Sequence, residues 1–156
     1  MVVIIDIDGT ICNAKRRFEK AGPEPIRDNV EAYNHWVKTV NEGCEHDEPV
    51  PGMSEICWAM KYSISRVVYL TSRTESLRKK TEEWLSNHNF PDLKVKMRPE
   101  DNFQETWKFK LEAIKRLRRH AKEQVLVIDD DEHGTIENMC KLNGFTFLKA
   151  RSGGQK

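Results

Sequence analysis

Near its start the chain reads Val2-Val3-Ile4-Ile5-Asp6-Ile7-Asp8-Gly9-Thr10, an apolar run that two acids interrupt. This pattern predicts a buried strand whose carboxyl end reaches an open crevice. Residues two apart in an extended chain point to the same face, so Asp6 and Asp8 can converge on one small volume. Two carboxylates held that close repel each other unless a cation or a shared proton compensates them. The run therefore predicts a divalent-metal site that contains a nucleophile, with Gly9 allowing a tight turn.

Two plainer interpretations of this run stay open. A D-x-D-G string also occurs in EF-hand loops, but such a loop needs further oxygen ligands, and Thr10-Ile11-Cys12 is too apolar to supply them. The run could also be a simple turn after a strand, in which Asp8 bonds its own backbone.

The bulk composition limits the possible classes of protein. With 156 residues, the chain suffices for one domain with a substantial core. Its 26 basic and 25 acidic residues nearly balance, so no global field points to nucleic acid as a partner. No apolar run reaches the length of about 18 residues that a membrane span needs. Because the chain enters a core strand directly, we expect no cleaved signal peptide.

The cysteines and histidines show no ligand pattern. Cys12, Cys44, Cys57 and Cys140 are widely scattered, without a C-x-x-C pair. This spacing fits reduced thiols in a cytoplasmic protein better than a disulfide framework or a zinc site. The histidines have no metal-ligand spacing and are predicted to lie on the surface.

Strand-like and helix-like segments alternate after the first run. Further strands are predicted at Val67–Leu70, Leu93–Met97, Val125–Ile128 and Phe145–Leu148. Helical periodicity covers about 53–60, 77–85, 105–121 and 136–142. This alternation predicts an α/β fold over residues 1–150, a Rossmann-like three-layer arrangement with a central parallel sheet and helices on its faces.

The segment 12–50 interrupts this alternation. It is polar, carries three prolines, and contains one predicted helix from Asp28 to about Val40, with Tyr33 and Trp36 on one side. An insertion directly after the first strand is expected to lie over the crevice as a small lid. Residues 151–156 are predicted to form a flexible tail.

Polar residues stand at the end of each predicted strand. In open α/β sheets, ligands bind outside the carboxyl ends of the strands. These ends deliver Asp6 and Asp8, then Thr71, then Asp129 and Asp130, and Lys110 in the third helix can reach the same place. Carboxylates that gather a divalent ion, a hydroxyl and a fixed cation together suit a phosphoryl group.

In their order and spacing, these motifs resemble the haloacid-dehalogenase superfamily of aspartyl-phosphate phosphatases over nearly the whole chain. A narrower resemblance is to the 3'-phosphatase domain of bacteriophage polynucleotide kinase-phosphatase. It is carried by Val50-Pro51-Gly52, Leu70–Glu75, Thr81–Leu85, Met97-Arg98-Pro99 and Lys110-Leu111-Glu112. No phosphate-binding loop of the kinase type is present, so the resemblance implies the phosphatase half alone.

The resemblance implies a magnesium-dependent phosphomonoesterase with assigned residue roles. Asp6 would be the nucleophile, Asp8 the general acid and base, Thr71 a donor to the phosphoryl group, and Lys110 a neutralising cation. Magnesium would be held by Asp6, by the backbone carbonyl of Asp8 and by Asp129 or Asp130. Arg17 and Arg73 would bind the substrate, for which a DNA or RNA 3' end is expected.

Several alternatives stay open at this point. The stretch Asn102–Trp107 lacks the acids and arginine expected before the site lysine, and Lys108 could replace Lys110. Arg16 is as good a candidate as Arg17 by charge. Asp131 could cap a helix beginning near Glu132, and Asp129 and Asp130 could do the same. The basic run 115–119 favours a solvated helix face, and Trp36 and Trp107 are candidates for stacking on a base.

Two other functions are also considered for these motifs. A nucleotidase or small-molecule acid phosphatase would use the same motifs, and a catalytically idle module that binds a phosphorylated ligand would have lost Asp6 or Asp8. Neither acid is lost.

Overall fold

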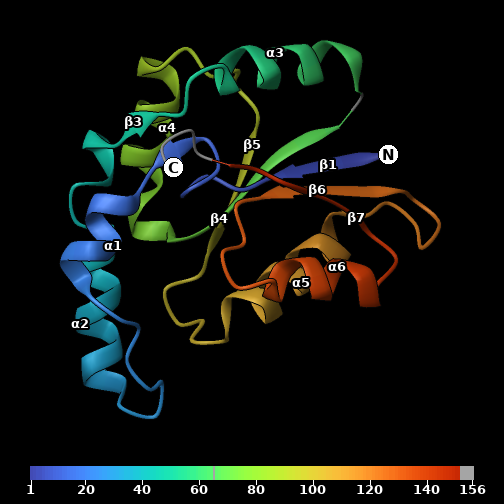
Figure 1. Ribbon diagram of the computed structural model, residues 1–156. Helices are drawn as coiled ribbons and strands as arrows, with labels where there is room; N and C mark the ends of the chain where they lie inside the picture. The colour runs from blue at the N-terminus through green and yellow to red at the C-terminus, as the bar shows by residue number, and fades with distance from the viewer. Residues whose placement is uncertain (65, 152–156) are drawn as a thin grey trace.

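The computed structural model describes residues 1–64 and 66–151 (Figure 1). Its centre is a five-stranded sheet in the order β5-β4-β1-β6-β7, and all neighbouring strands run parallel. The strands are β1 (Val2–Ile5), β4 (Val67–Thr74), β5 (Lys94–Arg98), β6 (Val125–Asp129) and β7 (Thr146–Lys149). The predicted α/β fold with a central parallel sheet is confirmed. Of the predicted tail, residues 152–156 lie outside the described part.

Helices cover both faces of this sheet. They are α3 (Met53–Ser63), α4 (Arg78–Asn87), α5 (Thr106–Leu117) and α6 (Thr135–Leu142), with a short 3-10 turn η2 (Glu75–Leu77) before α4. In Figure 1, α3 and α4 lie on one side of the sheet and α5 and α6 on the other. Each helix connects two parallel strands, as crossover connections require.

Alternate residues of β1 supply two separate cores. Val3 and Ile5 pack in the cluster that contains Trp84 of α4, whereas Val2 and Ile4 pack in the cluster that contains Ile114 of α5. All four β1 residues are buried, because the strand lies at the middle of a sheet covered on both faces. Each such side chain stabilises the fold by about 1.5–3 kcal/mol relative to exposure. The strand that carries the acids is therefore firmly fixed.

Several predicted limits and faces were wrong. Helix α5 ends at Leu117 rather than near 121, because Arg118 takes an extended conformation. Helix α6 begins at Thr135 rather than near Glu132, after a turn that closes on Gly134 in the left-handed region. The helical periodicity of 53–60 and 136–142 also places Ile56 and Leu142 on apolar faces, but these residues are 44% and 77% exposed.

The segment between β1 and α3 contains more structure than the sequence pattern indicated. Its elements are β2 (Cys12–Asn13), α1 (Lys15–Ala21), α2 (Val30–Asn41), η1 (Cys44–His46) and β3 (Glu48–Pro49). The predicted helix is α2, whereas α1 was missed because Phe18 is its one large apolar residue and no apolar stripe marks it. Strands β2 and β3 pair antiparallel and close the insertion.

Within the described residues, no helix is both long and apolar enough to cross a membrane.

Candidate active site

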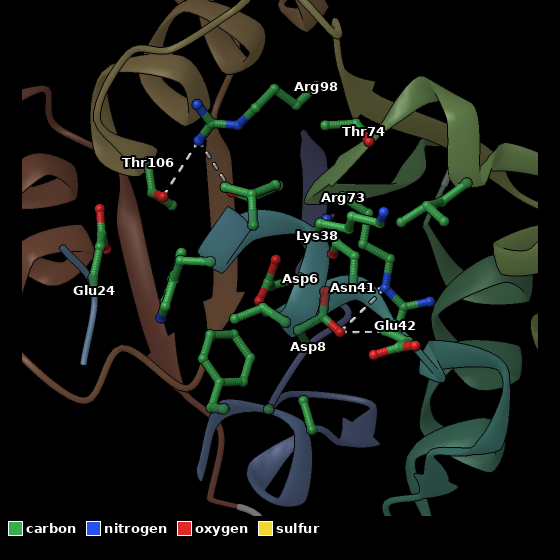
Figure 2. Close-up of a pocket in the computed structure, with 18 of the residues that line it drawn as sticks. Asp6, Asp8, Glu24, Lys38, Asn41, Glu42, Arg73, Thr74, Arg98 and Thr106 are labelled. Carbon is green, nitrogen blue, oxygen red and sulfur yellow. Dashed lines mark hydrogen bonds and ion pairs between the residues drawn. The ribbon is translucent and has the colours of Figure 1, made fainter. Parts of the chain in front are cut away.

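A cleft of about 1880 Å3 opens at the carboxyl ends of the strands. Its lining comes from the ends of β1, β4 and β6, from the start of α5, and from α1 and α2 of the insertion. Figure 2 shows Asp6 and Asp8 near its centre, with Arg73 on one side and Arg98 on the other. The insertion and the strand ends thus face each other across one open site.

One part of the site is an acidic cluster of Asp6, Asp129 and Asp130. Carboxylate oxygens of these residues all lie within 4.8 Å of one another. The Lys110 ammonium joins them, since its Nζ lies 2.9 Å from Asp6 Oδ1 and 2.6 Å from Asp129 Oδ2. Lys110 itself is buried on α5, beside Phe109 and Ala113. One cation among three acids leaves an excess of negative charge.

This excess is visible in the pKa values of the acidic cluster. Burial raises the pKa of Asp6 well above its usual value, and Asp129 and Asp130 raise it further while Lys110 opposes them. Burial, reinforced by Asp129, raises the pKa of Asp130 to about 6. Burial acts against the charge of Lys110, but Asp129 and Asp6 outweigh it and raise the lysine pKa. The cluster therefore favours an additional positive charge.

The donor set of the acidic cluster fits a hard divalent cation. Carboxylate oxygens are the ligands that such ions prefer in proteins. Gly9 is part of the arrangement, because a Cβ built on it would lie 2.0 Å from Asp130 Oδ2. Gly9 also has φ +81°, a conformation that other residues adopt at a cost. Any larger residue at position 9 would displace an acid that could hold the metal.

A second part of the site is an arginine cluster of Asp8, Arg17, Asp47 and Arg73. Arg73 bonds both oxygens of Asp8, with Nε at 3.1 Å from each and Nη2 at 2.8 Å from Oδ1. Arg17 Nη2 lies 2.5 Å from Asp8 and 2.5 Å from Asp47, and its Nε also bonds Asp47. The remaining Arg17 donor, Nη1, bonds the Val40 carbonyl at the end of α2. Two guanidiniums and two carboxylates balance in charge here.

The charges around Asp8 are opposite in sign to those around Asp6, because Asp8 lies between two guanidiniums. Although burial acts in the other direction, Arg73 and then Arg17 hold the pKa of Asp8 well below its usual range. Thr71 Oγ1 donates to Asp8 Oδ2 at 3.2 Å and accepts the Arg73 backbone N–H. The Asp8 side chain thus lies outside the acidic cluster and is ionised.

The structure shows which residue of each alternative pair reaches the site. Lys110 rather than Lys108 reaches the acids, since Lys108 is exposed and pairs with Glu105 at 2.7 Å. Arg17 rather than Arg16 reaches the site, since Arg16 is exposed.

Asp131 acts near the start of α6 as expected. Its Oδ2 accepts the Glu137 backbone N–H at 2.8 Å, although the helix begins later than predicted.

The two tryptophans predicted for base stacking differ in their surroundings. Trp36 stacks on Tyr33 with ring centroids 6.1 Å apart, and its Nε1 donates to the Gly22 carbonyl. Trp36 therefore anchors helices α1 and α2 of the insertion to each other. Trp107 is half-buried and faces the cleft, with Lys108 Nζ over its ring. Trp107 also packs against the core cluster that contains Phe109 and Ala113.

Two site residues escaped sequence reasoning. Asp47 lies in the run Glu45-His46-Asp47-Glu48, which reads as a solvated acidic segment, yet its side chain is 5% exposed. Arg98, at the end of β5, is buried and lines the cleft. A signal for Arg98 was present, because it follows a strand end like the other site residues, in the motif Met97-Arg98-Pro99.

A family model described as the LNS2 domain of PITM 1-3 matches residues 48–129, just over half of the chain. The chain belongs to the LNS2 domain family. The matched part runs from the end of the insertion through β4, α5 and β6, and so includes Thr71, Lys110 and Asp129. No sequence among the curated proteins matches the chain.

Solved structures with the same fold are distant in sequence. A chain of the Pnkp1/Rnl/Hen1 complex is 18% identical, with a TM-score of 0.68 over 99% of this chain and 47% of its own length. A haloacid dehalogenase-like hydrolase from Streptococcus pneumoniae is 14% identical, with a TM-score of 0.63 over 95% and 83%. The class C acid phosphatase of Bacillus anthracis is 12% identical, with a TM-score of 0.58 over 97% and 66%.

These likenesses identify the fold of this LNS2-family chain as that of the haloacid-dehalogenase-like hydrolases. The predicted fold is confirmed. The chain spans about half the length of the Pnkp1/Rnl/Hen1 chain that it matches.

Proposed function

We propose that the chain is a magnesium-dependent phosphomonoesterase that works through an aspartyl-phosphate on Asp6 and removes 3'-phosphates from nucleic-acid ends. The observation that carries this proposal is the acidic cluster with Lys110 in its midst, at the carboxyl ends of the central strands. Carboxylates and a fixed cation at this place suit phosphoryl transfer, which needs positioning and charge neutralisation. Neither the nucleophile nor the acid is missing, which argues against an idle binding module.

In this proposal the residues of the acidic cluster have distinct tasks. Asp6 attacks phosphorus, and the oxygen that leaves takes a proton from Asp8. Lys110 orients the Asp6 carboxylate by its 2.9 Å contact and opposes the rise in its pKa that burial causes. Magnesium, held by Asp6, Asp129 and Asp130, would supply charge neutralisation for the phosphoryl oxygens.

The arginine cluster would prepare Asp8 for its role as an acid. In the free protein, Arg17 and Arg73 hold Asp8 in its ionised form. An arriving phosphate competes for the same guanidiniums, because an arginine fork binds phosphate as well as carboxylate. Asp8 then loses counter-charge and binds a proton more readily. The predicted substrate contacts of Arg17 and Arg73 and the predicted acid role of Asp8 are thereby linked.

The substrate assignment rests on two supports. The cleft is wide and covered on one side by a small insertion, which leaves room for a large substrate. Among the structural neighbours is a chain of an RNA repair complex of Pnkp1, Rnl and Hen1.

The buried free thiols of Cys12, Cys44, Cys57 and Cys140 are consistent with a cytoplasmic location.

One observation favours a second candidate, a nucleotidase or small-molecule phosphatase. Carboxylates outnumber lysines and arginines along the lining of the cleft. A surface that tracks a long nucleic-acid backbone carries excess positive charge instead. A substrate with few phosphates suits this lining better than a long strand.

A substrate panel tests the proposal. Phosphate release would be measured, with magnesium and with EDTA, from a 3'-phosphorylated oligonucleotide, 3'- and 5'-mononucleotides and an aryl phosphate. We expect metal-dependent release, fastest from the oligonucleotide. Preference for free mononucleotides would replace the proposed substrate by the second candidate, and no release from any compound would reject the phosphatase.

A further inference from the structure

Three arginines are buried in the described part of the chain, and they differ in whether carboxylates compensate their positive charge. Arg17 and Arg73 each contact two carboxylates of the arginine cluster. Arg98 is 5% exposed, and within the described residues its hydrogen-bond partners are neutral carbonyls, an amide and hydroxyls. A buried charge without a counter-charge is costly, so its position at the edge of the cleft calls for an explanation.

The contacts of Arg98 fix the guanidinium but leave one edge weakly used. Its Nη1 donates to the Gln104 carbonyl at 2.6 Å and more weakly to Asn102. Its Nη2 reaches only hydroxyls, Thr106 Oγ1 at 3.3 Å and Ser72 Oγ at 3.5 Å. Both hydroxyls can donate as well as accept. Nη2 and the two hydroxyls therefore form a set of three donors on the cleft side, and Figure 2 shows Arg98 reaching toward Thr106.

The surroundings of Arg98 add positive rather than negative charge. Arg27 Nη1 donates to the same Gln104 carbonyl, at 2.5 Å, so two guanidiniums converge on one oxygen. Two carboxylates near this edge are already paired: Glu24 pairs with Arg27 at 2.6 Å, and Glu105, just before α5, pairs with Lys108 at 2.7 Å. Burial, with a smaller effect of Arg27, lowers the pKa of Arg98. This edge of the cleft is thus short of one negative charge.

The start of α5 also favours an anion at this edge of the cleft. Thr106 is the first residue of this 12-residue helix, and the preceding Glu105 gives no side-chain cap. The free backbone N–H groups and the helix dipole favour an anion at this end. Together with the buried Arg98, this places three kinds of anion donor around one point: a guanidinium, two hydroxyls and a helix N-terminus.

Building on the proposed function, we propose that Arg98, Ser72 and Thr106 form a second anion subsite, which binds one phosphate group next to the group that Asp6 attacks. Ser72 directly follows Thr71, and Thr106 precedes Lys110 by one helical turn. Four residues of helix separate Thr106 from Lys110 by about 6 Å along the axis, a distance that the sugar between two phosphates can span. The subsite and the reaction centre are therefore adjacent.

The rest of the lining limits the number of phosphates that the cleft can recognise. Most other lining cations of the described part already pair with an acid, as Lys15 does with Glu19 and Lys80 with Glu45. Among the described residues Lys38 forms no ion pair either, but it is exposed on α2. The positive charge of Arg98 can therefore compensate one additional phosphate. That group could be the 5'-phosphate of a nucleoside 3',5'-bisphosphate or the last phosphodiester of a nucleic-acid strand.

Turnover of three substrates tests the subsite. The value of kcat/KM would be measured for a nucleoside 3'-monophosphate, the matching 3',5'-bisphosphate and a 3'-phosphorylated dinucleotide. We expect a preference for substrates with a second phosphate, and Arg98→Gln should reduce the ratio of their kcat/KM to that of the monophosphate by about tenfold or more. The matched control Lys38→Gln, which removes an exposed cation of the same cleft, should change this ratio by less than about twofold.

The source of the second phosphate follows from the two larger substrates. Preference for the dinucleotide alone assigns the subsite to a phosphodiester, preference for the bisphosphate alone to a terminal phosphate, and preference for both to either. A wild-type ratio near one would overturn the subsite, as would an Arg98→Gln variant that loses activity on all three substrates equally.

Direct binding keeps the subsite testable without turnover. Calorimetry on Asp6→Asn should show tighter binding of the bisphosphate than of the monophosphate, and Arg98→Gln in that background should remove the difference. If the wild type released no phosphate at all, the proposed function would fail while this comparison still decided the subsite. Should Arg98→Gln lower the thermal midpoint severely, Thr106→Val would replace it, with a loss of a few-fold in the same ratio.

Discussion

Asp6 and Asp8 leave the same strand two residues apart, yet they lie in clusters of opposite electrostatic character. Asp6 belongs to the acidic cluster, where three carboxylates share the single ammonium of Lys110. Asp8 belongs to the arginine cluster, where two guanidiniums meet two carboxylates. The pKa of Asp6 is accordingly raised and that of Asp8 lowered. The first cluster is therefore incomplete without a further cation, whereas the charges of the second are balanced within the protein.

The largest difference between the two clusters should appear when Asp6 loses its charge. Asp6→Asn keeps the size of the side chain but removes the nucleophile, so turnover should fall by at least about 10³-fold while the fold is kept. Phosphate release and circular dichroism would be measured together. Turnover near the wild-type value would exclude Asp6 as the nucleophile.

Gly9→Ala should damage the acidic cluster without touching an acid. The new Cβ would lie 2.0 Å from Asp130 Oδ2, and the positive φ adds strain of about 1 kcal/mol or more. We expect magnesium affinity to fall by about 10- to 100-fold, measured as the metal concentration that gives half-maximal activity. The matched control is Gly22→Ala, since Gly22 also has positive φ but has open space around it. Equal effects of the two changes would show that strain, and not the displaced Asp130, is responsible.

The arginine cluster should respond in stability more than in metal affinity. Asp47→Asn leaves Arg17 and Arg73 with one carboxylate, Asp8, between them, and breaking a buried pair costs about 3 kcal/mol. Denaturant unfolding would measure this loss, and magnesium affinity should stay near the wild-type value. A variant that is as stable as the wild type would show that Asp47 does not hold the cluster together.

The two clusters should also differ in their dependence on pH. In the metal-free protein Asp130 has a raised pKa of about 6, so the folded state binds more protons than the unfolded state between about pH 4 and pH 6. Stability should therefore fall as the pH rises through this window. Asp8 has a lowered pKa, so its contribution is present above about pH 4 and is lost only as the pH falls below that value.

Thermal unfolding in EDTA across pH 4–7 checks this difference. Asp130→Asn should flatten the fall in the midpoint between pH 4 and pH 6, and added magnesium should stabilise the wild type more at pH 7 than at pH 4. A midpoint that rises steadily over this range in both proteins would contradict the assignment of the raised pKa to Asp130.

The sequence predicted the acidic cluster well because position in the chain determines it. Asp6 directly follows β1 and Asp129 ends β6, and these two strands pair in parallel, so that their carboxyl ends meet at one edge. Lys110 could be chosen over Lys108 only with the helix phase known, since Lys110 shares the buried face of α5 with Ala113 and Ile114. Local pattern and topology together are sufficient for this half of the site.

The arginine cluster could not be derived in the same way. Its contacts join Asp8 to Arg73 across 65 residues and Arg17 to Asp47 across 30 residues of the insertion. Asp47 lies in an acidic run whose composition favours exposure, and only the antiparallel closure of β2 on β3 and the bond from Trp84 Nε1 to its carbonyl bring it inward. The helix α1 that carries Arg17 has no apolar stripe. Tertiary packing, rather than sequence pattern, determines this half.

In the proposed mechanism, Asp6 accepts the phosphoryl group in a site completed by a cation at the acidic cluster. A crystal structure with magnesium and beryllium fluoride tests it most directly, because this fluoride forms a stable mimic of an acyl phosphate. We predict the adduct on a carboxylate oxygen of Asp6, with magnesium between Asp6, Asp129 and Asp130. An adduct on another residue, or a metal bound away from these three acids, would contradict the claim.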